Sequence, residues 1–202
     1  MVVGDPYLRT FDASKPEQRA ISHVCLGQDR SVDTPHLPST PCLRLRAETF
    51  FPSCWDGRNL DSADHKSHMA FPAIGDYNTG VCPASHPVAL LSVFLEFFYD
   101  TGAVRDFGRW VWAMGDPTGY GLHGDFVNGW ADQGALERAM GSCTGARGVD
   151  DPRCSLNVGP GGPGRSSRRS PQTEPPPEEV GLRGPLDRLP GDNPVTGDTV
   201  RG

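Results

Sequence analysis

The stretch LRLRAETFF, from Leu43 to Phe51, decides the fold class that the sequence predicts. Apolar residues at positions 43, 45 and 47 alternate in it with charged residues at positions 44, 46 and 48. Alternation with a period of two is typical of a β-strand that buries one face. Pro52 follows directly and offers no backbone donor, so we predict a half-buried strand that ends at Phe51.

Two further stretches also predict strands. Val88 to Tyr99 is apolar on both alternating faces, which suits a central strand between two layers, although a buried helix of this length gives the same pattern. Trp110 to Met114 repeats the pattern briefly before the proline and glycines of residues 115–119, which are typical of a turn. A strand over residues 110–114 is therefore predicted to end at this turn.

Two helices are predicted beside these strands. Ser14 is a hydroxyl cap followed by a proline in the first turn and by Glu17, and this motif predicts a helix that runs to about Cys25. Asp132 can cap a later helix, in which apolar residues recur at helical spacing. Because long loops rather than crossover helices join the strands, we predict an α+β fold rich in β-structure, an antiparallel β-sandwich with peripheral helices.

Length and composition predict one globular domain and a tail. The chain has 202 residues, enough for one buried core, and we place the domain at residues 1–155. Residues 156–202 are rich in glycine, proline and arginine and have too few apolar side chains to offset the entropy of ordering, so we predict a disordered tail. The net charge of -6 disfavours nucleic acid as a partner. No apolar run approaches the roughly 20 residues that a membrane span needs.

Six cysteines, an even number without a Cys-x-x-Cys pair, favour disulfides over a zinc site. Cys143 and Cys154 are close in sequence and are predicted to pair. The sequence does not assign the other four. Disulfides indicate an oxidising compartment, whereas the N-terminal residues have no signal-peptide pattern. Either the thiols are free in the cytosol, or the chain is the downstream part of a longer secreted protein, and we favour the second interpretation.

The densest polar cluster, residues 54–68, directly follows the predicted strand and contains Asp56, Asp64, His65 and His68. Loops at strand ends are common positions for functional sites. If the chain is helical from Ser62, the two histidines lie on one face and can hold a divalent metal such as zinc. The alternative is that both histidines hydrogen-bond backbone carbonyls and fix a long loop.

A second cluster, residues 115–130, places His123 and Asp125 among several glycines. A carboxylate beside an imidazole can act as a general base or acid, whereas the alternative is that Asp125 caps a helix. Trp55, Tyr120 and Trp130 flank the two clusters. Aromatic faces beside carboxylates suit sugar binding, although tryptophans more often belong to the core.

Long motifs carry a resemblance to a known family. These are VGDP at residues 3–6, FFPSCWDG at 50–57, LDSADHKSHM at 60–69 and GDPTGYGLHGDF at 115–126. They resemble the downstream part of DUF1996, a fungal secreted family of unknown function that is often found beside WSC carbohydrate-binding modules. The resemblance implies an extracellular setting and a polysaccharide or cell-wall partner. Family members also have a signal peptide and an upstream half with a Gly-His-Val-His motif, neither of which this sequence contains.

These observations lead to a functional hypothesis with two alternatives. The hypothesis is a polysaccharide-directed enzyme, a hydrolase or a lyase, in which clustered carboxylates and imidazoles line a cleft beside aromatic side chains. Its catalytic residues would be Asp56, Asp64, His65, His68, His123 and Asp125, and its sugar-stacking residues Trp55, Tyr120 and Trp130. The first alternative is a non-catalytic wall-binding or structural module, and the second is an inactive truncated product.

Overall fold

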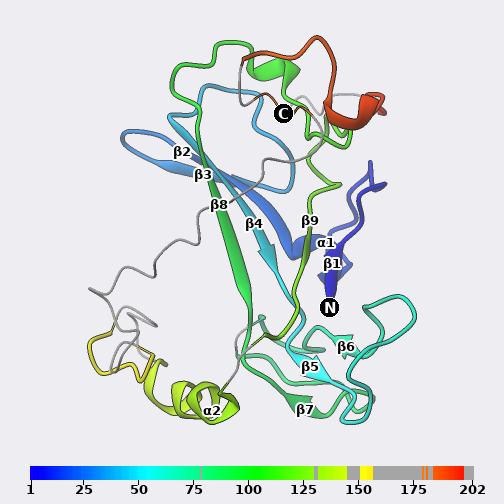
Figure 1. The fold of residues 1–202 in the computed structure, drawn as a ribbon, viewed down its shortest axis with the longest axis vertical. Coiled ribbons are helices and arrows are strands. Elements are labelled where there is room, and N and C mark those ends of the chain that lie inside the picture. Colours follow the sequence, from blue (N-terminus) through cyan, green and yellow to red (C-terminus); the bar gives the residue numbers. More distant parts are fainter. Residues whose placement is uncertain are drawn as a thin grey trace. The chain divides into compact units, whose positions relative to one another are not determined.

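The computed structural model describes residues 1–77, 79–129, 132–144, 151–156, 179, 181 and 184–197. The chain divides into two compact units (Figure 1). Unit 1 comprises residues 1–126 and 178–202, and unit 2 comprises residues 127–177.

The largest sheet of unit 1 has four antiparallel strands in the order β3-β2-β4-β8 (Figure 1). Its strands are β2 (Ile21–Leu26), β3 (Ser31–Thr34), β4 (Arg44–Phe50) and β8 (Phe94–Asp100). The predicted strand is confirmed as β4, which buries Leu45 and Ala47 while Arg44 is exposed. The predicted division into two faces holds only in part, because Glu48 of the charged face is buried and Leu43, just before the strand, is exposed.

Two smaller antiparallel sheets complete the β-structure. β1 (Val2–Gly4) pairs with β9 (His123–Asp125), and β5 (Cys54–Trp55) lies between β6 (Met69–Ala70) and β7 (Val88–Ala89). The helices are α1 (Pro16–Arg19) and, in unit 2, α2 (Gln133–Ser142), with short 3-10 helices at Phe107–Arg109 and Pro190–Asp192. The predicted β-rich α+β fold with antiparallel sheets is therefore confirmed.

The core of unit 1 forms where β4 and the following Phe51 meet the β1–β9 pair. Its buried apolar side chains are Val3, Ala20, Ile21, Ala47, Phe51 and Leu122. Phe51 makes an edge-to-face contact with Phe126, with 6.2 Å between the ring centroids. The glycine at position 124 permits close approach, since a Cβ there would lie 3.0 Å from the Thr49 hydroxyl.

The predicted helix over residues 14–25 is wrong for most of its length. Only Pro16–Arg19 is helical, and Ile21–Leu26 is strand β2. Ser14 does not cap the helix either, because Lys15 is the N-cap and the Ser14 hydroxyl donates to Asp12. Tertiary pairing explains the difference, since β2 lies between β3 and β4 and buries its apolar side chains in the core.

The predicted strands at 88–99 and 110–114 also need correction. Residues 88–99 contribute to two strands in different sheets, because β7 pairs with β5 whereas β8 pairs with β4. β8 is an edge strand of its sheet rather than a central one, and its apolar side chains are partly exposed. Residues 110–114 form no strand; Trp112 makes a single β-bridge to Asp116.

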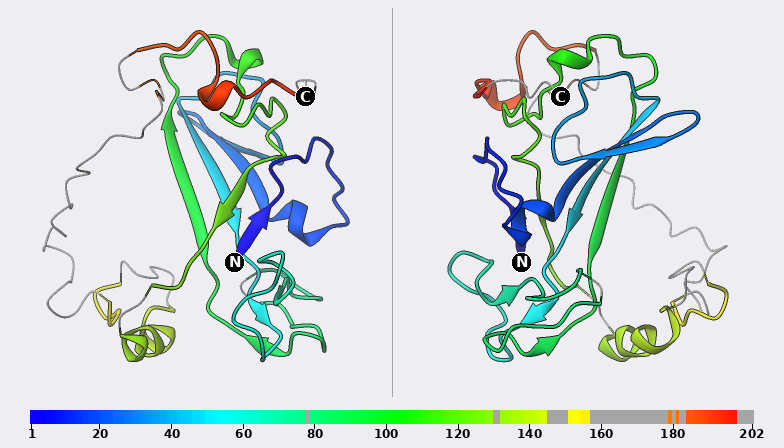
Figure 2. Two further views of the ribbon diagram at one scale, coloured as in Figure 1. Left: turned by 45° about the vertical axis from the view of Figure 1, so that its right-hand side comes forward. Right: turned by 180° about the vertical axis from the view of Figure 1, so that it is seen from behind.

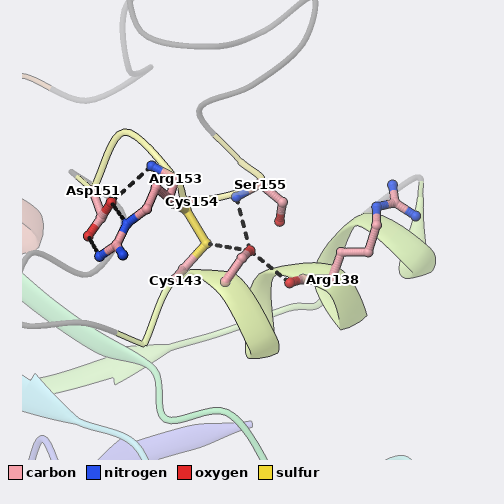
Figure 3. The surroundings of a disulfide bond; sticks show 7 residues. Arg138, Cys143, Asp151, Arg153, Cys154 and Ser155 are labelled. Carbon is pink, nitrogen blue, oxygen red and sulfur yellow. Dashed lines mark hydrogen bonds and ion pairs between the residues drawn. A yellow bond between two sulfur atoms is a disulfide. The ribbon is translucent and has the colours of Figure 1, made fainter.

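Three disulfides are present: Cys25–Cys42, Cys54–Cys82 and Cys143–Cys154. The last confirms the predicted pairing and closes the end of α2 onto residues 151–156 of unit 2 (Figure 3). Ser142 supports this closure, because its hydroxyl accepts the Ser155 amide at 3.0 Å and donates to the Arg138 carbonyl at 2.8 Å. As predicted for α2, Asp132 caps the helix by accepting the Ala135 amide.

The predicted boundary at residue 155 differs from the division into two units, since residues 178–202 cluster with unit 1. Much of the tail predicted to be disordered lies outside the described residues. Residues 184–197 are described, and Thr196 donates its amide to the Gly115 carbonyl at 2.8 Å. Within the described part of the chain, no helix has the length and apolar character of a membrane span.

Candidate functional site

A pocket of about 560 Å³ lies in unit 1 between β1, α1 and the loop that leads into β6. This volume falls within the roughly 300–1,000 Å³ of small-molecule sites. Its apolar lining includes Val3, Ile21, Met69 and Phe71. Its polar and aromatic lining includes Asp5, Lys15, Glu17, Gln18, Asp64, Lys66 and Tyr120. The pocket therefore combines an apolar surface, charges of both signs and one phenol ring.

Two hydrogen bonds attach the loop at residues 61–68 to β1. The Lys66 ammonium donates to the Gly4 carbonyl at 2.5 Å, and the Val2 amide donates to the His65 carbonyl at 2.8 Å. β1 is in turn paired with β9. One wall of the pocket is thus held by bonds between segments that are far apart in the sequence.

Asp64 organises this loop. Its carboxylate accepts the amides of Lys66 and Ser67 at 3.0 and 2.9 Å and the hydroxyls of Ser62 and Ser67 at 2.7 and 2.9 Å. These donors stabilise the anion and hold the pKa of Asp64 well below its ordinary value. The Asp64 carboxylate is therefore an ionised acceptor at neutral pH and is unsuited to act as a general acid.

The two histidines of the loop make separate contacts. His65 has a positive φ of 54°, is exposed, and places Nδ1 2.8 Å from the Asp61 carboxylate. His68 is buried, with Nδ1 2.8 Å from the Ser62 hydroxyl. The helical conformation that the metal hypothesis required from Ser62 does not form, because residues 63–68 are turns and bends. Among the residues that the structure describes, no three His, Cys, Asp or Glu side chains are grouped so as to hold a metal ion.

Asp56 and Trp55 stabilise the turn that follows β5. Asp56 accepts the amides of Arg58 and Asn59 at 2.8 and 2.9 Å, and chiefly these bonds lower its pKa to about 2. The Trp55 indole donates to the Asn59 carbonyl at 2.6 Å. Both polar groups are therefore occupied by contacts within the turn.

The second cluster is organised by Asp116, a residue outside the predicted site. Asp116 is fully buried and accepts the amides of Thr118, Gly119 and Gly121 at 2.8, 3.0 and 2.7 Å. These donors flank Tyr120, whose ring stacks on Phe11 with 5.7 Å between centroids. Burial, with a smaller contribution from Asp116, raises the pKa of the Tyr120 phenol. Asp116 thus fixes the turn that brings Tyr120 to the pocket.

His123 and Asp125 belong to strand β9, so the alternative prediction that Asp125 caps a helix is wrong. His123 is half-buried opposite Gly4 and has Nδ1 3.0 Å from the Gly121 carbonyl. Asp125 is exposed opposite Val2. Neither side chain lines the pocket.

The pocket brings together two of the residues predicted for the site, Asp64 and Tyr120. The remaining described ones lie outside its lining: Trp55, Asp56, His65, His68, His123 and Asp125. Trp130 lies outside the described residues. Sequence reasoning missed Lys15, Glu17 and Lys66, because residues 15–18 and the 61–68 loop are far apart in the sequence and the folded chain brings both to the pocket.

A family model described as a domain of unknown function, DUF1996, matches residues 1–130. That range contains every residue predicted for the site and every residue that lines the pocket. Neither a curated protein nor a solved structure matches the chain.

Proposed function

The chain belongs to DUF1996, a domain family of unknown function, and on that premise we propose that it is an extracellular saccharide-binding module. The observation that carries this proposal is the pocket of about 560 Å³ with Tyr120, Lys15, Glu17 and Lys66 in its lining. Three disulfides support an oxidising compartment.

The chemistry of the lining suits a sugar. A saccharide hydroxyl can both donate and accept a hydrogen bond. It can therefore donate to a carboxylate and accept from an ammonium group at the same time. Lys15 and Glu17 make no side-chain hydrogen bond or ion pair with the described residues. Both line the pocket, Lys15 as the N-cap of α1 and Glu17 from its first turn. Tyr120 offers an apolar ring with a polar end, which suits stacking against a sugar ring.

Non-catalytic binding is better supported than hydrolysis. A glycosidase needs a protonated general acid, whose pKa is raised, opposite a second carboxylate. The pKa values of Asp56 and Asp64 are instead lowered by the donors around them. His68 is buried against Ser62, and His123 lies outside the pocket lining. The polysaccharide-directed enzyme therefore stays as a second hypothesis, which rests on the three pocket carboxylates Asp5, Glu17 and Asp64.

The test is retention of the full chain on insoluble β-glucan, chitin and cellulose, followed by calorimetry with the matching soluble oligosaccharide. We expect retention on at least one polymer and a loss of roughly tenfold or more in affinity for Tyr120→Ala, as for aromatic side chains that anchor a ligand. Glu17→Gln should weaken binding without changing the melting temperature, because Glu17 is exposed.

Tyr7→Ala is the matched control, since Tyr7 is 86% exposed and lies outside the pocket lining. Equal retention of Tyr120→Ala and Tyr7→Ala would show that the pocket is not the binding site. Oligosaccharide fragments that appear with the wild type, and disappear with Glu17→Gln, would favour the enzyme instead.

A further inference from the structure

Residues 193–197 are held against a distant turn of unit 1. The Thr196 amide donates to the Gly115 carbonyl at 2.8 Å, and Asn193 Nδ2 donates to the Ala113 carbonyl at 3.1 Å. Figure 2 shows this red C-terminal segment beside the green chain that precedes β9. Backbone carbonyls of the turn therefore receive the segment at two points, one near each of its ends.

Arg9 holds the segment with one side of its guanidinium group. Nε donates to the Thr196 carbonyl at 2.8 Å, and Nη2 donates to the Thr196 hydroxyl at 2.9 Å. Nη1 instead donates to the carbonyls of Pro6 and Leu8 at 2.8 and 2.7 Å. These contacts and nearby Asp116 hold the planar Arg9 guanidinium group in place. Its Nε and Nη2 donors are therefore already oriented toward Thr196.

The shapes of the two partners also fit. Gly115 has a φ of +88°, and a Cβ at this position would lie 1.9 Å from the Pro194 carbonyl oxygen. A side chain there would therefore block the approach of the segment. Pro194 has a fixed φ and biases Asn193 to the extended conformation that it adopts, with φ -60° and ψ 123°. The segment loses little conformational freedom on docking.

We propose that Arg9, Ala113 and Gly115 form a peptide-recognition surface for an extended Asn-Pro-x-Thr segment, which the chain fills with its own residues 193–196. The surface recognises three features of the segment: the asparagine side-chain amide, the proline carbonyl that packs against Gly115, and the threonine hydroxyl. None of the three surface residues lines the saccharide pocket, so this surface is a second, separate site.

Amide hydrogen exchange of the full chain tests the docked state. The Thr196 amide should be protected in the wild type, and its exchange should be about tenfold faster or more in Arg9→Gln, as expected for the loss of hydrogen bonds to a charged donor. Arg105→Gln is the matched control, because Arg105 is an exposed arginine outside this surface. Equal Thr196 exchange in wild type and Arg9→Gln would overturn the proposal.

A second measurement leaves Arg9 and its fold unchanged. A labelled peptide of residues 189–197 is titrated into the wild type and into the double variant Asn193→Ala/Thr196→Ala. Because the variant's own segment competes less, we expect at least about tenfold tighter peptide binding to the variant than to the wild type. A peptide with the same two alanines should not bind.

Two results of this experiment would overturn the proposal. One is that the peptide fails to bind the double variant, or binds both proteins equally. The other is that protection of the Thr196 amide from exchange rises with protein concentration while light scattering gives a dimeric mass. The segment would then be bound by a second copy of the chain.

Discussion

Replacing Asp116 by alanine should strongly destabilise unit 1. The Asp116 carboxylate is fully buried, accepts three backbone amides of the turn at residues 118–121, and lies 3.7 Å from Arg9. It also accepts the Thr118 hydroxyl at 2.6 Å. Alanine leaves the amides without an acceptor and removes the anion from Arg9, so the turn that carries Tyr120 loses its organising group.

The size of the effect follows from these contacts. A buried donor left without a partner costs about 1–3 kcal/mol, and breaking a buried ion pair costs about 3–5 kcal/mol. We expect a loss of about 4 kcal/mol in the free energy of unfolding, because water can reach the Arg9 side chain, which is 18% exposed. At about 2–4 °C per kcal/mol for a domain of this size, the melting temperature should fall by about 8–16 °C.

Circular dichroism melts at neutral pH measure this shift. Asp116→Asn keeps one acceptor oxygen and should lose less stability than Asp116→Ala. Asp125→Ala is the control, since Asp125 is an exposed aspartate on β9 and should melt close to the wild type. The reasoning is refuted if Asp116→Ala melts as Asp125→Ala does.

Burial lowers the pKa of His23 to about 4, below its ordinary 6.5. The contribution of His23 to the free energy of unfolding should therefore be full above pH 6.5 and decline as the pH falls toward 4. Urea unfolding at several pH values should show a weaker dependence on pH in His23→Gln than in the wild type. Replacing Cys54 and Cys82 together by serine should lower the free energy of unfolding in urea by about 3–4 kcal/mol, because the disulfide spans 28 residues. A smaller loss than for removal of the Cys25–Cys42 disulfide, which spans 17 residues, would contradict this reasoning from loop entropy. Phe98→Lys on edge strand β8 should reduce light scattering on heating, since Phe98 is 47% exposed; unchanged scattering would show that this edge does not drive association.

Patterns of neighbouring residues in the sequence predicted one strand and one helix of the fold. The alternation at residues 43–51 identified β4, and the cap at Asp132 identified α2. The motif at Ser14 misled because its helix ends at Arg19, where pairing with β4 makes the next residues a strand. Residues 88–99 misled because apolar character on both faces does not distinguish a central strand from an edge strand whose aromatic side chains remain partly exposed.

The candidate site was predictable only in part, for the same reason. Asp64 and Tyr120 belong to motifs that the sequence marks clearly, and both line the pocket. Lys15 is the N-cap of α1 and Glu17 lies in its first turn, and no local signal relates them to residues 64–71. The sequence motifs also pointed to Asp56 and Asp64 as candidate acids or bases, whereas the amides that both carboxylates accept make them turn-forming acceptors.

The central claim is that the pocket between β1, α1 and the 61–68 loop binds a saccharide. The most direct measurement is a ¹⁵N-edited NMR titration of the full chain with the soluble oligosaccharide of whichever polymer retains it. We predict that shift changes concentrate at Gly4, Gln18, Lys66, Ser67 and Tyr120, which line the pocket. Shift changes that instead concentrate at residues 27–30, Gly102, Arg105 and Phe107, which line a separate pocket, would contradict saccharide binding in the first pocket.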